Sequence, residues 1–118
     1  MQTRIALVPL LLVALGTATA WSHAFLDHAS PLVGSTVKTS PHEVTLWFTQ
    51  SLEPAFSSVE VSDPKGARAD QGKAAVSGNT MRVGVKTLAP GSYRVRWHAL
   101  SVDTHRTEGS FTFQVGGK

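Results

Sequence analysis

Apolar and polar residues alternate with a period close to two along most of the chain. The alternation is clearest in the segments 44–49, 59–61, 81–85, 93–99 and 111–115. It is typical of strands that bury one face of a sheet and expose the other. Two weaker segments, near 24–29 and 74–76, bring the expected number to about seven strands, and no segment has a convincing helical period.

Proline and glycine separate these segments at regular intervals, and Ser77-Gly78-Asn79-Thr80 is typical of a hairpin connection. Short strands with regular turn signals predict an all-β, Greek-key β-barrel or sandwich of about seven strands. The residues in the inward phase form the predicted core: Val44, Leu46, Phe48, Val59, Val61, Val83, Val85, Tyr93, Val95, Trp97, Phe111, Phe113 and Val115.

The N-terminal part of the chain has the pattern of a secretory signal peptide. Arg4 precedes an apolar run at 5–15, and small residues follow at 16–20. The run is too short and wrongly flanked for a membrane span. We therefore expect residues 1–22 to be a cleaved signal peptide and 23–118 to be a single, soluble domain exported to a bacterial periplasm.

Three cleavage sites satisfy the pattern of small residues. Cleavage after Ala20 leaves Trp21 first, cleavage after Ser22 leaves His23 first, and cleavage after Ala24 removes His23 altogether. The pattern slightly favours the first site. The chemistry described below favours the second.

Composition narrows the classes of function. The chain has no cysteine, which excludes disulfides and thiolate metal sites. Its 11 Lys and Arg residues are scattered among 8 Asp and Glu, so a nucleic-acid surface is not expected. It has five histidines and only two methionines, which favours nitrogen ligands over a soft Cu(I) site.

Asp103 and His105 are the first candidate metal ligands. They are two residues apart, so on an extended strand they would point the same way. If His23 is the first residue of the mature chain, its α-amine and imidazole can chelate a metal together. Nitrogen and oxygen ligands in tetragonal geometry suit Cu(II), and zinc is the competing assignment.

The spacing alone leaves other interpretations open. An Asp-x-His pair is common in proteins. Asp103 and His105 can also be explained as a polar turn before the last strand, with no role in metal binding. A chain that begins at Trp21 would instead bind Cu(II) through its amine, two backbone amides and the imidazole of His23. That mechanism needs neither Asp103 nor His105.

The mature sequence resembles the CopC family of periplasmic copper-resistance proteins from end to end. The long block Pro90–His105 resembles the family signature G-T-Y-x-V-x-W-x-x-x-S-x-D-x-H, with Ser92 in place of the threonine. Three further blocks resemble the opening, a middle strand and the closing strand of the family: His23–Pro31, Leu46–Glu53, and Gly109 with Phe111–Val115.

The resemblance implies a cupredoxin-like or immunoglobulin-like Greek-key fold and one Cu(II) per chain, bound by His23, Asp103 and His105. It implies a non-enzymatic protein of copper homeostasis or resistance that sequesters copper or delivers it, with an inner-membrane copper transporter as a partner. Some members also hold Cu(I) in a methionine-rich loop. Here Met81 stands alone in the inward phase, so we expect a Cu(II)-only protein.

The other histidines and two glutamates are expected to play lesser parts. His28 is a surface residue or a spare ligand, His42 lies in a solvated loop, and His98 is a surface or supporting residue. Glu53 and Glu108 are candidates to orient a ligand imidazole by a hydrogen bond.

Two other classes of function compete with copper binding. One is a β-sandwich interaction module whose histidines bind no metal. The other is an oxidative copper enzyme that uses an N-terminal histidine brace. The second is disfavoured because the chain is short, has few aromatic residues, and would use Asp103 where oxygen should bind.

Overall fold

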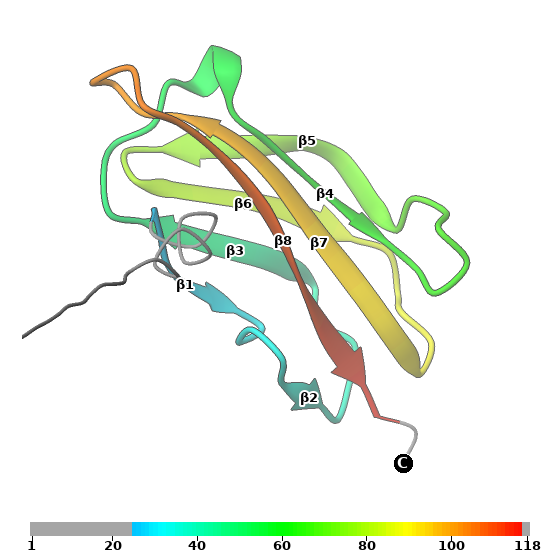
Figure 1. The fold of residues 1–118 in the computed structure, drawn as a ribbon. Helices are drawn as coiled ribbons and strands as arrows, with labels where there is room; N and C mark the ends of the chain where they lie inside the picture. The colour runs from blue at the N-terminus through cyan, green and yellow to red at the C-terminus, as the bar shows by residue number, and fades with distance from the viewer. Residues whose placement is uncertain (1–24, 117–118) are drawn as a thin grey trace, which may run out of the picture.

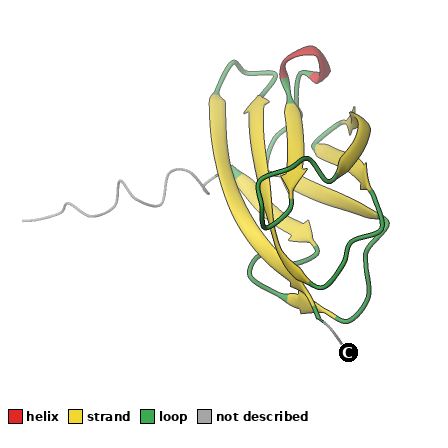
Figure 2. Cartoon of the chain, turned by 90° about the vertical axis from the view of Figure 1, so that its right-hand side faces the viewer, coloured by secondary structure: helices red, strands yellow, loops and turns green. Residues whose placement is uncertain are grey.

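Two four-stranded sheets make up the computed structural model, which describes residues 25–116 (Figure 1). The strand order of the first sheet is β1 (Leu26–Ser30), β3 (Glu43–Phe48), β6 (Thr80–Val85) and β5 (Asp70–Ser77). The order of the second is β2 (Thr36–Val37), β8 (Arg106–Val115), β7 (Gly91–Leu100) and β4 (Ser58–Ser62). A 3-10 turn, η2 (Pro54–Phe56), lies at one end of the strands (Figure 2). The predicted β-sandwich is thus confirmed.

The core lies between the sheets and confirms the predicted inward phase. All thirteen predicted core residues are buried, and Trp97, Phe48 and Phe113 are the largest side chains that are fully buried. The rings of Phe48 and Trp97 join the two sheets edge to face, with centroids 6.1 Å apart. Each such side chain contributes about 1.5–3 kcal/mol when fully buried, so the fold can be held without a disulfide.

The hairpin predicted at residues 77–80 is also confirmed. β5 ends at Ser77 and β6 begins at Thr80, and these two residues are paired across the strands. Gly78 has φ +60°, which the first central residue of a type II′ turn requires and glycine adopts without steric cost.

Three strands differ from the sequence prediction. β5 is longer than the predicted 74–76, and β8 begins at Arg106 rather than near residue 111. The first half of β8 lacks apolar alternation, and its pairing with β7 makes it a strand. The two residues of β2 were not predicted, and they pair with β8 in parallel because the connection after β1 crosses to the other sheet. No helix among residues 25–116 is long and apolar enough to span a membrane.

The β7–β8 loop and η2 lie at the same end of the sandwich (Figure 1). The segment between β3 and η2 runs beside this loop, because the backbone N–H of Glu53 donates to the carbonyl of Leu100 at 2.8 Å and that of Val102 donates to Ser51 at 3.0 Å. This end therefore brings together residues that are about 50 positions apart in the sequence.

Candidate metal centre

A five-residue loop, 101–105, connects β7 to β8. The strands stay paired as far as Leu100 and Arg106, and the loop then closes on itself. The backbone N–H of Ser101 donates to the carbonyl of His105 at 2.8 Å, and that of Thr104 donates to the carbonyl of Ser101 at 2.9 Å. Thr104 has φ +72°, in the left-handed region, which reverses the chain between Asp103 and His105.

The loop brings Asp103 and His105 together, as the sequence predicts, although by a different geometry. They do not lie on an extended strand, because Thr104 turns the chain between them. Asp103 Oδ1 lies 3.1 Å from His105 Nδ1. The side chain of Asp103 is 47% exposed and that of His105 is 79% exposed, so both are open to an ion from solvent.

Ser101 and Gln50 both contact the carboxylate of Asp103. Ser101 is fully buried, and its hydroxyl donates to Asp103 Oδ1. The Ser101 hydroxyl oxygen in turn accepts from the His105 backbone N–H at 3.1 Å. The side-chain amide of Gln50 is assigned the orientation in which its nitrogen, and not its oxygen, faces the carboxylate. This nitrogen lies 3.0 Å from each carboxylate oxygen of Asp103. The hydrogen bond from Ser101, with smaller contributions from His105, keeps the pKa of Asp103 below its usual value.

The two facing atoms have the separation expected of neighbouring metal ligands. Ligands about 2.0–2.2 Å from a metal and at right angles to each other are about 3 Å apart. The 3.1 Å between Asp103 Oδ1 and His105 Nδ1 matches this value. An imidazole nitrogen and a carboxylate oxygen that is kept ionised are suitable donors for Cu(II) or Zn²⁺.

The third predicted ligand, His23, lies outside the described residues. The chain enters the described part at Phe25, whose carbonyl accepts a hydrogen bond from the Thr49 N–H at 3.0 Å. Thr49 is followed directly by Gln50, whose amide contacts Asp103. Within residues 25–116, no three His, Cys, Asp or Glu side chains gather closely enough to hold a metal.

His28 lies on the exposed face of β1, beside a different carboxylate. The pairing of β1 with β3 is irregular between Leu26 and His28, and the neighbouring side chains of Asp27 and His28 are both exposed. His28 Nδ1 lies 2.6 Å from Asp27 Oδ2. Its ring stacks on Trp47 with centroids 4.4 Å apart. Within the described residues, the side chain of His28 therefore contacts Asp27 and Trp47.

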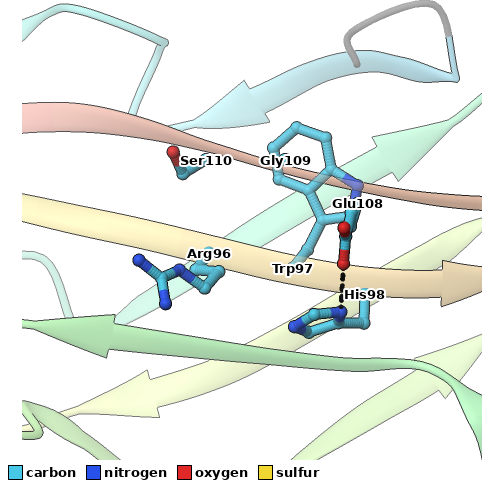
Figure 3. A pocket seen from close by; sticks show the side chains of 6 residues that line it. All are labelled: Arg96, Trp97, His98, Glu108, Gly109 and Ser110. Carbon is cyan, nitrogen blue, oxygen red and sulfur yellow. Dashed lines mark ion pairs between the residues drawn. The ribbon is translucent and has the colours of Figure 1, made fainter. Parts of the chain in front are cut away.

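His98 and Glu108 form a separate pair on the outer face of the second sheet. His98 Nδ1 lies 2.9 Å from Glu108 Oε1 across β7 and β8, at an open pocket of about 310 Å³ (Figure 3). Glu108 thus contacts His98, which is not one of the predicted ligand imidazoles. Glu53, the other candidate to orient a ligand imidazole, contacts the β7 end through its backbone N–H, which donates to the carbonyl of Leu100. His42 lies exposed in a loop, as predicted.

Gln50 and Ser101 are site residues whose functional role was not predicted from the sequence. The serine belongs to the Ser-x-Asp-x-His block, so its proximity to Asp103 was visible, but its hydrogen bonds were not. Gln50 is 53 positions before Asp103, and the contact between them depends on how the two sheets stack.

Comparison with known proteins agrees with the fold. Residues 26–116 match the CopC domain model. The chain is 34% identical to Protein YobA of Escherichia coli K12, over 90% of this chain and 89% of that protein. It is 32% identical to Copper resistance protein C of Xanthomonas campestris pv. juglandis, over 92% and 91%. The crystal structure of CopC from Methylosinus trichosporium OB3b covers 80% of this chain and 95% of its own, with 35% identity and a TM-score of 0.74. The chain belongs to the CopC domain family.

Proposed function

We propose that this chain is a periplasmic, non-enzymatic protein that binds one Cu(II) ion through His23, Asp103 and His105. It would sequester copper or deliver it to an inner-membrane transporter. Relatives named copper resistance protein C match most of the chain, which supports copper as the metal. The proposed periplasmic location depends on the predicted signal peptide.

The facing atoms of Asp103 and His105 are the observation that carries the proposal. Their 3.1 Å separation suits two adjacent positions around one metal. The pKa of Asp103 is lowered, first by Ser101, so the carboxylate is available as an anion near neutral pH. The donor set is nitrogen and oxygen without sulfur, which favours Cu(II) over Cu(I).

The contacts of Phe25, the first described residue, support a part for His23. Phe25 is hydrogen-bonded to Thr49, the neighbour of Gln50, and Gln50 contacts Asp103. His23 is two residues before Phe25, and two residues of extended chain span at most about 7 Å. If the mature chain begins at His23, its amine and imidazole would add two nitrogens to the donors of Asp103 and His105.

Mutation of His105 tests the proposed site. We expect His105→Ala to weaken Cu(II) binding by at least 100-fold in a competition titration with a chelator of known affinity. His28→Ala and His98→Ala are matched controls, since each removes an exposed imidazole that is paired with a carboxylate elsewhere. Unchanged affinity in His105→Ala, or an equal loss in all three variants, would refute the site.

The intact mass of the exported protein tests the part that His23 plays. A mass that begins at His23, with an electron spin resonance spectrum of a tetragonal, nitrogen-rich Cu(II) centre, supports the three-residue site. A mass that begins at Trp21 would favour binding by the Trp21-Ser22-His23 terminus and would leave Asp103 and His105 as loop residues. A Zn²⁺ competition in the same samples would show which metal the site prefers.

A further inference from the structure

Gln50 makes a side-chain contact that its exposed position does not require. It follows β3 in the first sheet, whereas Asp103 lies in the β7–β8 loop of the second sheet. Its amide nitrogen nevertheless lies 3.0 Å from both oxygens of Asp103 and 3.3 Å from the hydroxyl oxygen of Ser101. A surface glutamine loses side-chain entropy when it is held in one conformation, so this convergence on one carboxylate calls for a function.

We propose that Gln50 is a positioning residue for the copper ligand Asp103, an inference that rests on the function proposed above. A carboxylate can rotate about its bond to Cβ and can bind a metal through one oxygen or two. A donor that contacts both oxygens fixes the plane of the group. It therefore keeps Oδ1 at the 3.1 Å from His105 Nδ1 that suits adjacent ligands.

The backbone around Gln50 is itself held on both sides. The N–H of Thr49 donates to Phe25 at 3.0 Å, and the carbonyl of Ser51 accepts from Val102 at 3.0 Å. The first bond holds the segment that leads to His23, and the second holds the loop that carries Asp103. Gln50 is the residue between these two attachment points, so its amide reaches Asp103 from a fixed backbone.

The neutral charge of Gln50 also matters for the ligand. An amide N–H stabilises the anionic form of Asp103 and adds no charge of its own. Ser101, which is fully buried, also donates a hydrogen bond to this carboxylate, at Oδ1. Partners that orient metal ligands in this way typically change metal affinity 10- to 100-fold when they are removed.

Replacement of Gln50 by methionine tests the proposal. Gln50→Met keeps the length and approximate volume of the side chain and removes its amide donor. We expect 10- to 100-fold weaker Cu(II) binding and a changed hyperfine splitting in the spin resonance spectrum, with an unfolding midpoint close to that of the parent chain. Gln114→Met is the matched control, because Gln114 is an exposed glutamine on β8 that pairs with Ser92 and Thr36.

Asp103→Ala, measured in the same series, separates this inference from the proposed function. If Asp103→Ala loses affinity while Gln50→Met keeps the parent affinity and spectrum, the positioning role is refuted and the copper site stands. If Asp103→Ala binds as tightly as the parent, the proposed site itself fails. If Gln50→Met and Gln114→Met weaken binding equally, the effect is not specific and the positioning role is also refuted.

Discussion

The side chain of Asp70 accepts a hydrogen bond from the backbone N–H of Val61 at 2.8 Å, which links β5 of one sheet to β4 of the other. Arg68 donates to the same carboxylate through Nε at 2.9 Å and through Nη2 at 2.7 Å. Burial raises the pKa of Asp70, but the hydrogen bonds from Arg68 and Val61 outweigh it, so the pKa lies below its usual value. β4 is an edge strand, and this carboxylate accepts from one of the backbone donors on its open edge.

Removal of this carboxylate should destabilise the fold. Asp70→Ala leaves the Val61 N–H without its acceptor in a buried position, and a group of that kind costs about 1–3 kcal/mol. We expect a loss of this size in the free energy of unfolding, measured by urea titration. Asp70→Asn keeps an acceptor for Val61 and should lose less. Equal stability of Asp70→Ala and the parent would show that the link between the sheets contributes little.

Acid should remove the stabilisation that the ionised carboxylate of Asp70 gives to the fold. Because the pKa of Asp70 is lower in the folded chain than in the unfolded chain, its ionised form stabilises the fold. That stabilisation is complete above the unfolded pKa of about 3.9 and is lost as the pH falls through the folded value. The difference in unfolding free energy between the parent and Asp70→Ala should therefore be constant from pH 7 to about pH 5 and shrink below about pH 4.

A second carboxylate, that of Asp103, serves as a control for the pH dependence assigned to Asp70. Asp103 also has a lowered pKa, for which the hydrogen bond from Ser101 is the main cause. It lies in an exposed loop, so its contribution should persist in Asp70→Ala with the same sign. A difference between the parent and Asp70→Ala that grows on acidification would contradict the assignment of the shift to Asp70.

Met81 should serve the core and not the metal. Its side chain is fully buried on β6, where it pairs with Leu46 of β3 and Val76 of β5. Met81→Leu conserves the volume and should cost less than about 1.5 kcal/mol of stability. We expect Cu(II) affinity to stay within twofold of the parent in the titration used for His105→Ala. A selective loss of Cu(I) binding in this variant would overturn the expectation of a Cu(II)-only protein.

Alternation along the chain was enough to predict the sandwich and its core, because every second residue of a half-buried strand must be apolar. It failed at the first half of β8, where Glu108, Gly109 and Ser110 carry no such pattern and the long β7 provides the pairing partner. It also failed at β2, which consists of two residues only. Both strands depend on tertiary neighbours rather than on local sequence.

At the candidate site, too, some features follow from local sequence and others depend on tertiary contacts. The two-residue spacing predicted that Asp103 and His105 point the same way, but on an extended strand. The structure brings them together in a loop instead, because Thr104 turns the chain between them. The contact of Gln50 with Asp103 has no local signal, since it depends on the stacking of two sheets. The position of His23 remains a prediction that depends on processing of the chain.

The bond between the Val102 N–H and the Ser51 carbonyl joins the loop that carries Asp103 and His105 to the segment that follows β3 of the other sheet. If His23 binds the same ion as proposed, that ion would also connect the chain before β1 of the first sheet to the β7–β8 loop of the second, as a removable cross-link at one end of the sandwich. Its release and the local opening of that end would then be linked equilibria. Loosening of this end would then be enough to release a bound ion, while the core between the sheets stays folded.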